Sequence, residues 1–335
     1  ATHTGAPNFA YSMCLDKITD EEFASWDLSC IEMMMSAGEP IEQDVMDMLL
    51  EKLHHFSKVD KNVYCPSYGL AENAVCITMN GKKTLKVDRK KLMQGILNIS
   101  PEGMQITSCG KIISNVPVAI VKNEFEIGSN KIGEIWISGP SLATHYINEG
   151  EGDLSKRLPT RYGRWFRTGD IGFIHDGDLF IIGRAGDTIK VVEQFIFPNI
   201  IESVINMSVK GLRKGSTTVY FNELSSVLSV AIEMQHRNNV DSMLDISKKI
   251  NACILDLFAV HIVDIHFLSP KSALKTSSGK LQRIQTGAAV SSGKISPIAS
   301  FNMSTNGQVV LTKHPKKTLP SLFKIRGAKR VKQEQ

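Results

Sequence analysis

The stretch FRTGDIGFIHDGDLFIIGRAGD, residues 166–187, carries the clearest fold signal in the chain. Two apolar runs, GFIH and DLFIIG, flank the dipeptide Asp176-Gly177. An Asp-Gly pair between such runs is typical of a two-residue β-hairpin turn. The glycine-flanked segment GRAGD that follows predicts a domain boundary near residues 184–188. We therefore expect a β-rich block to end here and a second unit to begin.

Upstream of this hairpin, one helix and several strands are expected. Residues 39–57 place apolar side chains three and four positions apart, with Pro40 just inside the start, which predicts an amphipathic helix. Short apolar runs predict strands at 33–35, 116–121 and 134–138, and 187–192 is read as a further strand. The apolar face of the helix is formed by Ile41, Val45, Met48, Leu49, Leu53 and Phe56.

Downstream of Pro198 the pattern changes to helix–strand–strand–helix–strand. The expected elements are 198–207, 217–221, 228–234, 241–259 and 261–268. They make up roughly 100 residues, the size of a small independent domain. This order predicts a compact α+β unit.

The composition indicates an ordinary globular protein. The chain has 335 residues, of which 42% are hydrophobic and 22% charged, so it can hold two or three domains. Its six cysteines form no Cys-x-x-Cys pair, which favours reduced thiols and a cytoplasmic location. The chain lacks an apolar run of the roughly 20 residues that a membrane span needs. Its first residues have neither the basic start nor the apolar core of a signal peptide. It does not start with Met, and we expect it to begin within a longer protein.

The net charge of +5 is concentrated at one end of the chain. Residues 288–335 contain nine Lys or Arg and one Glu, so the rest of the chain is slightly acidic. Such a run is usually a solvated end, and less often a patch for nucleic acid or a membrane surface. We expect residues 288–335 to be a basic, disordered tail, and we do not expect nucleic acid as a partner.

Near the end of the second unit, LKTSSGKLQR (residues 274–283) suggests phosphate binding. A Walker A loop requires a glycine five residues before the Gly-Lys pair and a hydroxyl after the lysine. Leu274 and Leu281 occupy these two positions, so Lys280 is not a P-loop lysine. Taken alone, the segment is best explained as a mobile loop with a solvated lysine.

Three other segments are equally ambiguous when each is considered alone. YCPSYGLAEN (64–73) reads as a turn with a surface carboxylate at Glu72, and FRTGDIG (166–172) as an Asx-type turn closed by Asp170. GRAGDTIK (183–190) reads as a glycine-flanked loop with one arginine.

Taken in order, however, five segments resemble the signature motifs of the adenylate-forming enzymes. They are SAGEP (36–40), SYGLAE (67–72), GEIWISGPSLATHY (133–146), the stretch at 166–187 and KTSSGKLQR (275–283). The opening ATHTGAPNFAY and the long stretch between Glu72 and Gly133, with LKVDRKKLMQGI inside it, resemble the fatty acyl-AMP ligase branch. The resemblance covers about residues 1–287.

The resemblance implies an α/β and α+β fold in three parts. Residues 1–186 would be the C-terminal portion of the large AMP-binding domain, a sheet followed by a β-rich subdomain. Residues 187–287 would be the small mobile lid domain, and 288–335 the tail. The glycine- and hydroxyl-rich phosphate loop of the family would lie before Ala1, so we expect residues 1–335 to be inactive alone.

The resemblance also implies a chemistry. Adenylation is the attack of a carboxylate on the α-phosphorus of ATP, so catalysis requires positioning and cationic stabilisation of phosphate oxygens. Lys280 would be the catalytic lysine, Glu72 would hold Mg²⁺, and Asp170 would accept hydrogen bonds from the ribose hydroxyls. The other implied roles are nucleotide contacts by Gly38, Glu39, Pro40, Tyr68, Gly69 and Arg184, a hinge at Gly186 and Asp187, and a catalytic contact by His3.

The implied activity is ATP- and Mg²⁺-dependent conversion of a fatty acid to an acyl-adenylate. The acyl group would pass to an acyl carrier protein or a polyketide synthase. Two alternatives remain open: an acyl-CoA synthetase of the same fold, and a non-catalytic acyl- or nucleotide-binding module. The sequence departs from the family pattern at His145, Ile147, Glu193, Phe195 and Leu274.

Overall fold

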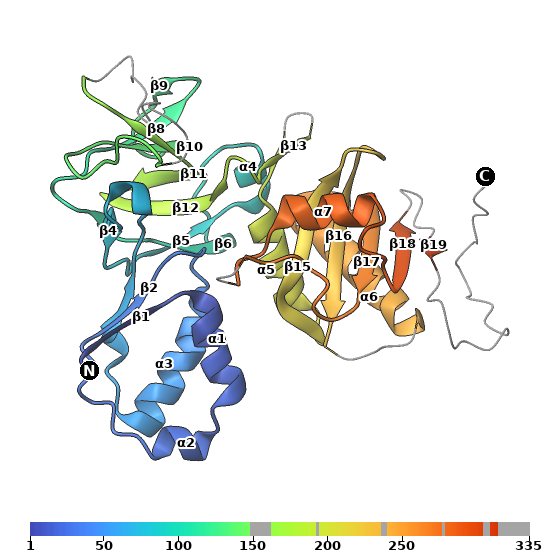
Figure 1. Ribbon diagram of the computed structural model, residues 1–335, viewed down its shortest axis with the longest axis horizontal. Helices are drawn as coiled ribbons and strands as arrows, with labels where there is room; N and C mark the ends of the chain where they lie inside the picture. Colours follow the sequence, from blue (N-terminus) through green and yellow to red (C-terminus); the bar gives the residue numbers. More distant parts are fainter. Residues whose placement is uncertain (148–161, 192–193, 236–239, 277–278, 304–308, 314–335) are drawn as a thin grey trace. The chain divides into compact units, whose positions relative to one another are not determined.

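The chain forms two compact units, Ala1–Gly186 and Asp187–Gln335. The computed structural model describes residues 1–147, 162–191, 194–235, 240–276, 279–303 and 309–313 (Figure 1). The two units are taken in turn below.

Unit 1 begins with a small parallel sheet of order β1-β2-β3, formed by His3–Ala6, Met33–Ser36 and Tyr64–Pro66. Ala6 pairs with Ser36 and Ser36 pairs with Pro66, so the carboxyl ends of all three strands meet at one edge. In open α/β sheets ligands bind at this edge. Three helices accompany these strands: α1 (Asn8–Lys17), α2 (Asp20–Ala24) and α3 (Gln43–Ser57).

The helix expected at 39–57 is α3, but it begins at Gln43 and its buried face differs from the prediction. Met48, expected in the core, is 54% exposed, whereas Met46 is fully buried. Leu49 and Leu53 are buried as expected, and Leu50 joins them. The apolar positions of this helix cover more than one face, so spacing alone left the direction of the core ambiguous.

The β-rich part of unit 1 is a seven-stranded antiparallel sheet, and its central hairpin confirms the prediction at 166–187. His175 pairs with Asp178, and Asp176 and Gly177 both have positive φ, as a type I′ turn requires. A two-stranded sheet of β5 (Thr84–Val87) and β6 (Met104–Thr107) flanks α4 (Arg89–Met93). The seven strands, in sheet order, are β4 (Thr78–Met79), β7 (Lys111–Ile112), β12 (Asp178–Arg184), β11 (Phe166–His175), β10 (Gly133–Ile137), β8 (Val118–Lys122) and β9 (Phe125–Glu126).

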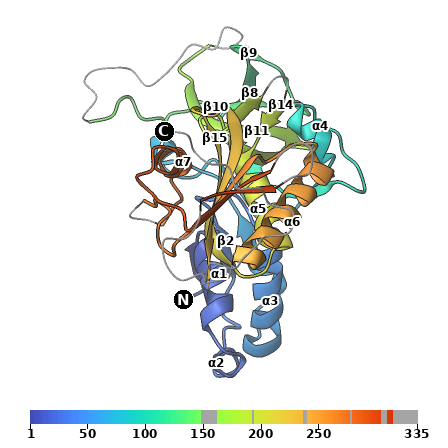
Figure 2. The same ribbon diagram turned by 90° about the vertical axis from the view of Figure 1, so that its right-hand side faces the viewer.

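Unit 2 is an α+β unit, as predicted. It opens with the hairpin β13–β14 (Ile189–Val191 and Gln194–Ile196) and continues into a five-stranded sheet of order β15-β16-β17-β18-β19. Helix α7 (Arg283–Ser291) covers one face of this sheet, and α5 (Pro198–Ser208) and α6 (Val240–Phe258) cover the other (Figure 2). The first three strands are β15 (Leu212–Asn222), β16 (Val227–Met234) and β17 (Asp264–Leu268).

The expectation of a disordered tail from residue 288 is wrong for much of that segment. Residues 288–291 complete α7, and β18 (Ala299–Met303) and β19 (Val309–Lys313) extend the sheet of unit 2. Ala299, Phe301 and Met303 alternate toward the core and are almost fully buried. Averaging the charge over residues 288–335 hid this period-two pattern. Residues 304–308 and 314–335 lie outside the described part.

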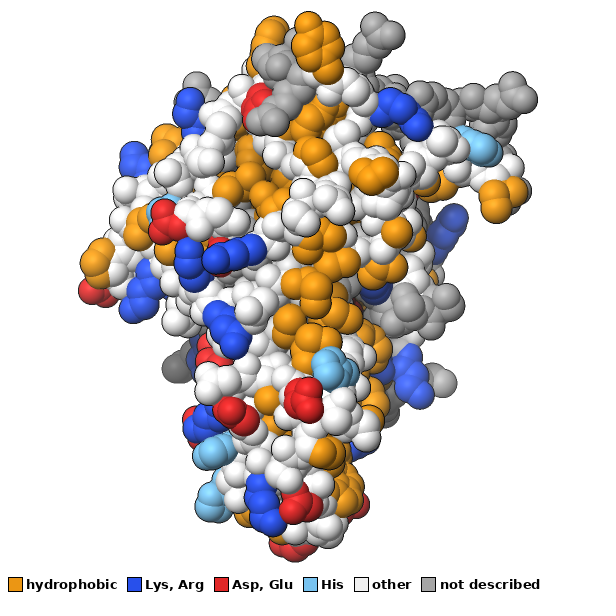
Figure 3. All heavy atoms as spheres, turned by 90° about the vertical axis from the view of Figure 1, so that its left-hand side faces the viewer, with side chains coloured by type: hydrophobic (Ala, Val, Ile, Leu, Met, Phe, Trp, Pro, Cys, Tyr) orange, Lys and Arg blue, Asp and Glu red, His pale blue; other side chains and the backbone are white. Residues whose placement is uncertain are grey.

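Unit 1 shows a band of hydrophobic side chains on one face (Figure 3). Large apolar side chains with high exposure in this unit include Phe9 (45%) and Met13 (54%), both on α1. None of the helices described here is long and apolar enough to cross a membrane.

Candidate active site

The structure brings three of the sequence-predicted residues of unit 1 into direct contact. The Tyr68 hydroxyl donates to Oδ2 of Asp170 at 2.6 Å, and Nε of Arg184 donates to Oδ1 of the same carboxylate at 2.8 Å. Tyr68 and Asp170 are 102 residues apart in sequence. Asp170 is mostly buried, with 14% of its side chain exposed, whereas Arg184 is 65% exposed. The cluster therefore opens toward solvent on the arginine side.

The β11–β12 hairpin explains why these side chains meet. Asp170 pairs directly with Arg184 in the register of the two strands, so Asp170 lies in a strand and not in an Asx turn. The Asp170 amide donates to the Thr168 hydroxyl at 3.0 Å, next to an irregularity in the pairing at Ile171 and Gly172. Burial, and then the negative charge of Asp170, raises the pKa of Tyr68, so the phenol remains a donor.

Glu72 lies on a short 3-10 helix, Ala71–Asn73, and Tyr146 holds its side chain. The Tyr146 hydroxyl donates to Oε1 of Glu72 at 2.6 Å, and the Ala143 amide donates to the Glu72 carbonyl at 2.7 Å. The motif ending at residue 146 is thereby joined to SYGLAE. Tyr146 is the last residue of the motif quoted at 133–146, but its contact with Glu72 was not predicted.

The loop at 36–40 follows β2, at the carboxyl edge of the parallel sheet. Gly38 has a φ of +81°, a conformation that favours glycine. The buried Asn8 binds both sides of this loop: its amide donates to the Pro40 carbonyl, and its Oδ1 accepts from the Ser36 hydroxyl at 2.9 Å. Oε2 of Glu39 accepts from the Phe9 amide at 3.2 Å. Asn8 was missed as a site residue, although it lies in the quoted GAPNFAY segment.

Gly69 is required by a close backbone approach. A Cβ on this residue would lie 1.3 Å from the carbonyl oxygen of Val75. The preceding residue, Tyr68, bridges to Thr78 at the start of β4. The glycine therefore allows the chain to turn tightly beside Tyr68, and this fixes the tyrosine next to the β-rich sheet.

His3, predicted to make a catalytic contact, lies away from these loops. It is the first residue of β1 and pairs with Met33, at the end of the sheet opposite Ser36 and Pro66. Its Nδ1 forms a hydrogen bond of 2.8 Å with the Thr2 hydroxyl, and the side chain is exposed. This position gives no support to a contact with the reacting groups.

In unit 2, Lys280 lies beside a short antiparallel pairing of the described residues on either side of its motif. Lys275 pairs with Leu281, and the Thr276 amide donates to the Lys280 carbonyl at 2.8 Å. Gly279 adopts a φ of +85° in the turn, and Lys280 is exposed. Residues 277–278, within the same motif, lie outside the described part. The lysine is therefore presented on a defined hairpin.

The two predicted hinge residues stand where the units divide. Gly186 is the last residue of unit 1 and Asp187 the first of unit 2. A Cβ on Gly186 would meet no atom within 4 Å. Oδ2 of Asp187 accepts from Nη1 of Arg283 at 3.1 Å. Glu193, singled out in the sequence, lies outside the described residues.

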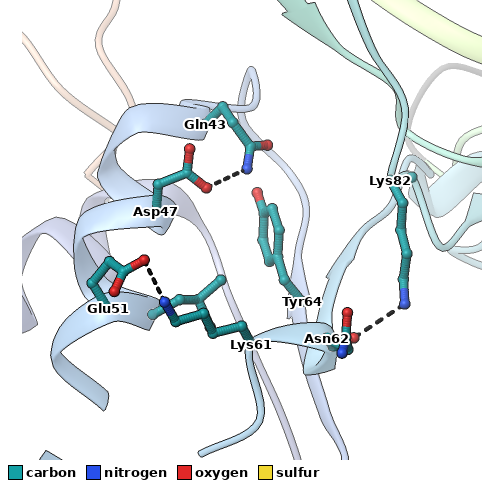
Figure 4. A pocket seen from close by; sticks show the side chains of 9 residues that line it. Gln43, Asp47, Glu51, Lys61, Asn62, Tyr64 and Lys82 are labelled. Carbon is teal, nitrogen blue, oxygen red and sulfur yellow. Dashed lines mark hydrogen bonds and ion pairs between the residues drawn. The ribbon is translucent and has the colours of Figure 1, made fainter. Parts of the chain in front are cut away.

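A surface pocket of about 380 Å³ in unit 1 contains none of the predicted site residues. Four of its polar side chains pair with one another: Gln43 with Asp47 at 2.7 Å, and Lys61 with Glu51 (Figure 4). Nζ of Lys82 donates to the Asn62 carbonyl at 3.1 Å. Groups already paired in this way are poor candidates for ligand contacts.

The residues described include no group of three or more His, Cys, Asp or Glu side chains that could hold a metal ion by themselves. A Mg²⁺ site made of one carboxylate and the phosphates of a bound nucleotide needs no such group. Glu72 fits this type of site, because Tyr146 occupies only one of its two oxygens.

Comparison with known proteins agrees with this geometry. Residues 1–147 match the model of the AMP-binding enzyme family. The chain is 30% identical over 303 residues to the medium-chain-fatty-acid–[acyl-carrier-protein] ligase JamA of Moorena producens, covering 84% of this chain and 51% of that protein. It is 27% identical over 300 residues to the long-chain-fatty-acid–AMP ligase FadD28 of Mycobacterium tuberculosis, with the same coverages.

A solved structure shows the same fold. A structure from a study of fatty acyl-adenylate ligases of E. coli and L. pneumophila superposes with a TM-score of 0.77 at 25% identity, covering 87% of this chain and 53% of that one. The chain thus spans about half the length of the relatives that it matches. Residues 1–147 thus match an AMP-binding enzyme domain, and the related sequences and the shared fold are those of fatty-acid and fatty acyl-AMP ligases.

Proposed function

We propose that this chain provides the nucleotide-binding and lysine-bearing parts of a ligase that activates a fatty acid with ATP to an acyl-adenylate. The observation that carries the proposal is the Tyr68–Asp170–Arg184 cluster. It joins two of the five motifs through side-chain contacts on a single carboxylate.

The hydrogen-bonding capacity of Asp170 supports binding of a ribose. An ionised carboxylate has about four acceptor positions. Tyr68 and Arg184 use one on each oxygen, which leaves capacity for both hydroxyls of a ribose. The ring of Tyr68 is only partly buried, which suits stacking on adenine, with the loop at Gly38 and Glu39 on the opposite side.

The phosphates would be held by groups on both units. Glu72 would share Mg²⁺ with the phosphate oxygens, and the metal would neutralise charge during attack by the fatty acid carboxylate. Lys280 would bring a compact positive charge to the acyl carboxylate and the α-phosphate. Arg184 would contact ribose or phosphate, and rotation at Gly186 and Asp187 would move the small unit.

Binding of a non-hydrolysable acyl-adenylate analogue, measured by calorimetry, tests the nucleotide site. Asp170→Asn should weaken binding by about tenfold or more, because a charge-assisted hydrogen bond is lost. The matched control is Asp176→Asn, at the exposed turn of the same hairpin, which should bind normally. Equal affinities of the two variants would contradict the proposed ribose contact.

The resemblance to fatty acyl-AMP ligases favours a carrier protein over CoA as the acyl acceptor. The segment that resembles the marker of that branch forms regular secondary structure: α4 lies between β5 and β6, and Leu92 and Met93 are fully buried. Product analysis with ATP, a long-chain acid and CoA tests this acceptor. We expect acyl-adenylate and little acyl-CoA; efficient acyl-CoA formation would identify an acyl-CoA synthetase instead.

Activity of residues 1–335 alone is a separate question. The chain spans about half the length of its relatives. Unit 1 also exposes large apolar side chains, which favour aggregation. We expect no fatty-acid-dependent ATP–pyrophosphate exchange from residues 1–335. Robust exchange by a monomeric preparation would contradict this, and retained analogue binding without exchange would fit the non-catalytic alternative.

A further inference from the structure

A buried carboxylate in unit 2 is bound by a guanidinium from the lysine motif. Glu202, on α5, is 5% exposed. Nε of Arg283 donates to both of its oxygens at 2.9 Å, and Nη2 donates to Oε2 at 2.8 Å. The Val219 amide, on the edge strand β15, also donates to Oε1 at 3.0 Å. Since α5 and α7 cover opposite faces of the sheet, this contact joins them around its edge.

The same guanidinium reaches the proposed hinge. Nη1 of Arg283 donates to Oδ2 of Asp187 at 3.1 Å. Burial raises the pKa of the Glu202 carboxyl, and the positive charge of Arg283 opposes that rise. Arg283 stays protonated under all ordinary conditions. The Arg283 guanidinium, on the first residue of α7, therefore contacts both Glu202 of α5 and Asp187, the first residue of unit 2.

A second buried carboxylate holds the other end of the lysine hairpin. Glu233, on β16, is fully buried. Its oxygens accept from the amides of Lys271 and Ala273, at 3.0 and 2.6 Å, and from Nη1 of Arg213 at 2.6 Å. Lys271 and Ala273 immediately precede the hairpin that carries Lys280. Because the carboxylate binds two backbone amides, it fixes the direction in which residues 271–273 lead into the hairpin.

Between these two anchors, the base of the hairpin is closed by main-chain contacts. The Gln282 amide donates to the Leu274 carbonyl at 2.9 Å. The Leu274 amide donates in turn to the hydroxyl of Thr286, which is fully buried in α7. Lys280 thus lies six residues after Leu274 and two before Gln282, so the base is held on both sides of it.

We propose that Glu202, Arg283 and Glu233 are positioning residues for Lys280. They hold both ends of its hairpin at fixed points of unit 2, and Arg283 ties that hairpin to the hinge residue Asp187. An exposed lysine on a four-carbon stem has much conformational freedom, so the direction of its charge depends on the base of its hairpin. A displacement of about 1 Å in a positioning element can cost 10² in rate.

This inference rests on the proposed function for its kinetic consequence, but its structural part can be tested without activity. Hydrogen–deuterium exchange of the 335-residue chain, resolved by mass spectrometry, compares peptides covering residues 271–283 with peptides from α6 and β16. Arg283→Lys keeps the charge but cannot contact both oxygens of Glu202 and Asp187 at once. We expect exchange at 271–283 to accelerate about tenfold while α6 and β16 remain unchanged.

Asp187→Asn provides a milder variant in case Arg283→Lys does not fold, because Asp187 is at the partly exposed end of the cluster. It should accelerate exchange of the hairpin about threefold. Its control, Asp245→Asn on the exposed face of α6, should leave the hairpin unchanged. Unchanged hairpin exchange in Arg283→Lys and Asp187→Asn, or uniform acceleration across unit 2, would overturn the inference.

The kinetic readout separates this inference from the proposed function. In a form of the protein that catalyses adenylation, Arg283→Lys should lower kcat by about 10² with the KM for ATP nearly unchanged. If the unaltered protein adenylates but the variant keeps its kcat, the positioning role fails and the proposed function stands. If the unaltered protein never adenylates while the exchange result holds, the proposed function fails and the anchoring stands.

Discussion

The two units organise their charged groups in opposite ways. In unit 1, Asp170 meets an arginine that is 65% exposed, and Glu72 is held by a partly exposed tyrosine. In unit 2, the carboxylates of Glu202 and Glu233 are almost fully buried. Partly exposed carboxylates with unused acceptor positions retain room for a ligand, whereas fully buried carboxylates bound by several donors serve to hold the structure. This difference fits the proposed roles, in which unit 1 binds the nucleotide and unit 2 supports Lys280.

The two units also differ in how their hydrophobic cores are divided. The buried residues of unit 1 fall into separate clusters, one around Leu49 and Phe23 beneath the parallel sheet and another around Ile135 and Leu179 in the β-rich part. Unit 2 surrounds one five-stranded sheet with helices on both faces. A single sheet covered on both faces is the simplest route to a stable small domain.

The largest expected effect concerns the extent of unit 2. Residues 187–313 should unfold cooperatively, whereas residues 187–287 should not. The shorter piece lacks β18, whose Phe301 pairs with Ile265 of β17, and both side chains are fully buried. Urea unfolding followed by circular dichroism distinguishes the two pieces. Equal cooperativity would mean that β18 and β19 contribute little to the fold.

The next effect contrasts a buried ion pair with a partly exposed one. Glu202→Ala leaves the Arg283 guanidinium buried without its main partner, which should cost unit 2 about 3–5 kcal/mol in the free energy of unfolding. Asp170→Ala removes a contact from an exposed arginine and one hydrogen bond from Tyr68, which should cost unit 1 about 1 kcal/mol.

The positions of the tryptophans allow these two costs to be measured separately. Trp26, Trp136 and Trp165 all lie in unit 1, so intrinsic fluorescence follows that unit. Unfolding of the isolated residues 187–313 reports on unit 2. Similar costs for the two variants would show that burial is not the relevant difference between the clusters.

The third effect is kinetic. In a form of the protein that catalyses exchange, Lys280→Ala should lower kcat 10²–10³-fold, or about 3–4 kcal/mol, because one charge aimed at the transition state is lost. Its ATP affinity should be nearly normal, whereas Asp170→Ala should act mainly on ATP affinity. Lys280→Arg should not restore the rate, because the planar guanidinium of arginine spreads its charge, whereas the lysine ammonium is compact. Lys248→Ala, on the exposed face of α6, is the control; near-normal exchange by Lys280→Ala would remove the lysine from the reaction.

Elements with local signals were predictable from the sequence. The hairpin at Asp176-Gly177 and the helices at 198–207 and 241–259 are marked by turn chemistry and by apolar spacing, which depend only on neighbouring residues. Strands β18 and β19 were missed because residues 288–335 were judged by their summed basic charge, although most of that charge lies from Lys313 onward. The motif order supplied the candidate residues of the site, but not their contacts.

Contacts between distant residues could not be predicted from one sequence. Tyr68 and Asp170 are 102 positions apart, and Arg283 and Glu202 are 81 apart. Glu202 did leave a local trace: it follows the buried Ile201 and precedes the buried Val204 on an otherwise apolar face of α5. A carboxylate on the buried face of a helix requires a charged partner. That signal predicts a buried ion pair but does not name the partner.

The smallest expected effect is alkaline unfolding, in which unit 1 should lose stability before unit 2. Burial raises the pKa of Tyr11 to about 12 and also raises those of Tyr64 and Tyr68, all in unit 1. Tyr220 is the corresponding tyrosine in the described part of unit 2. A folded-state pKa above the unfolded value of about 10 means that the folded state keeps its proton longer. The stability from each phenol is therefore complete below pH 10 and is lost as the pH rises toward the folded pKa.

For Tyr11, this loss amounts to roughly 2–3 kcal/mol by pH 12. An alkaline titration that records tryptophan fluorescence for unit 1, and amide exchange for unit 2, should show unit 1 unfolding first. Tyr11→Phe removes one of the three phenols with a raised pKa, together with its hydrogen bond to the Met35 carbonyl. It should lower the stability of unit 1 at neutral pH but make that stability less dependent on pH above 10. If unit 2 unfolded first, or if Tyr11→Phe left the pH dependence of unit 1 unchanged, the buried phenols would not control the alkaline stability of unit 1.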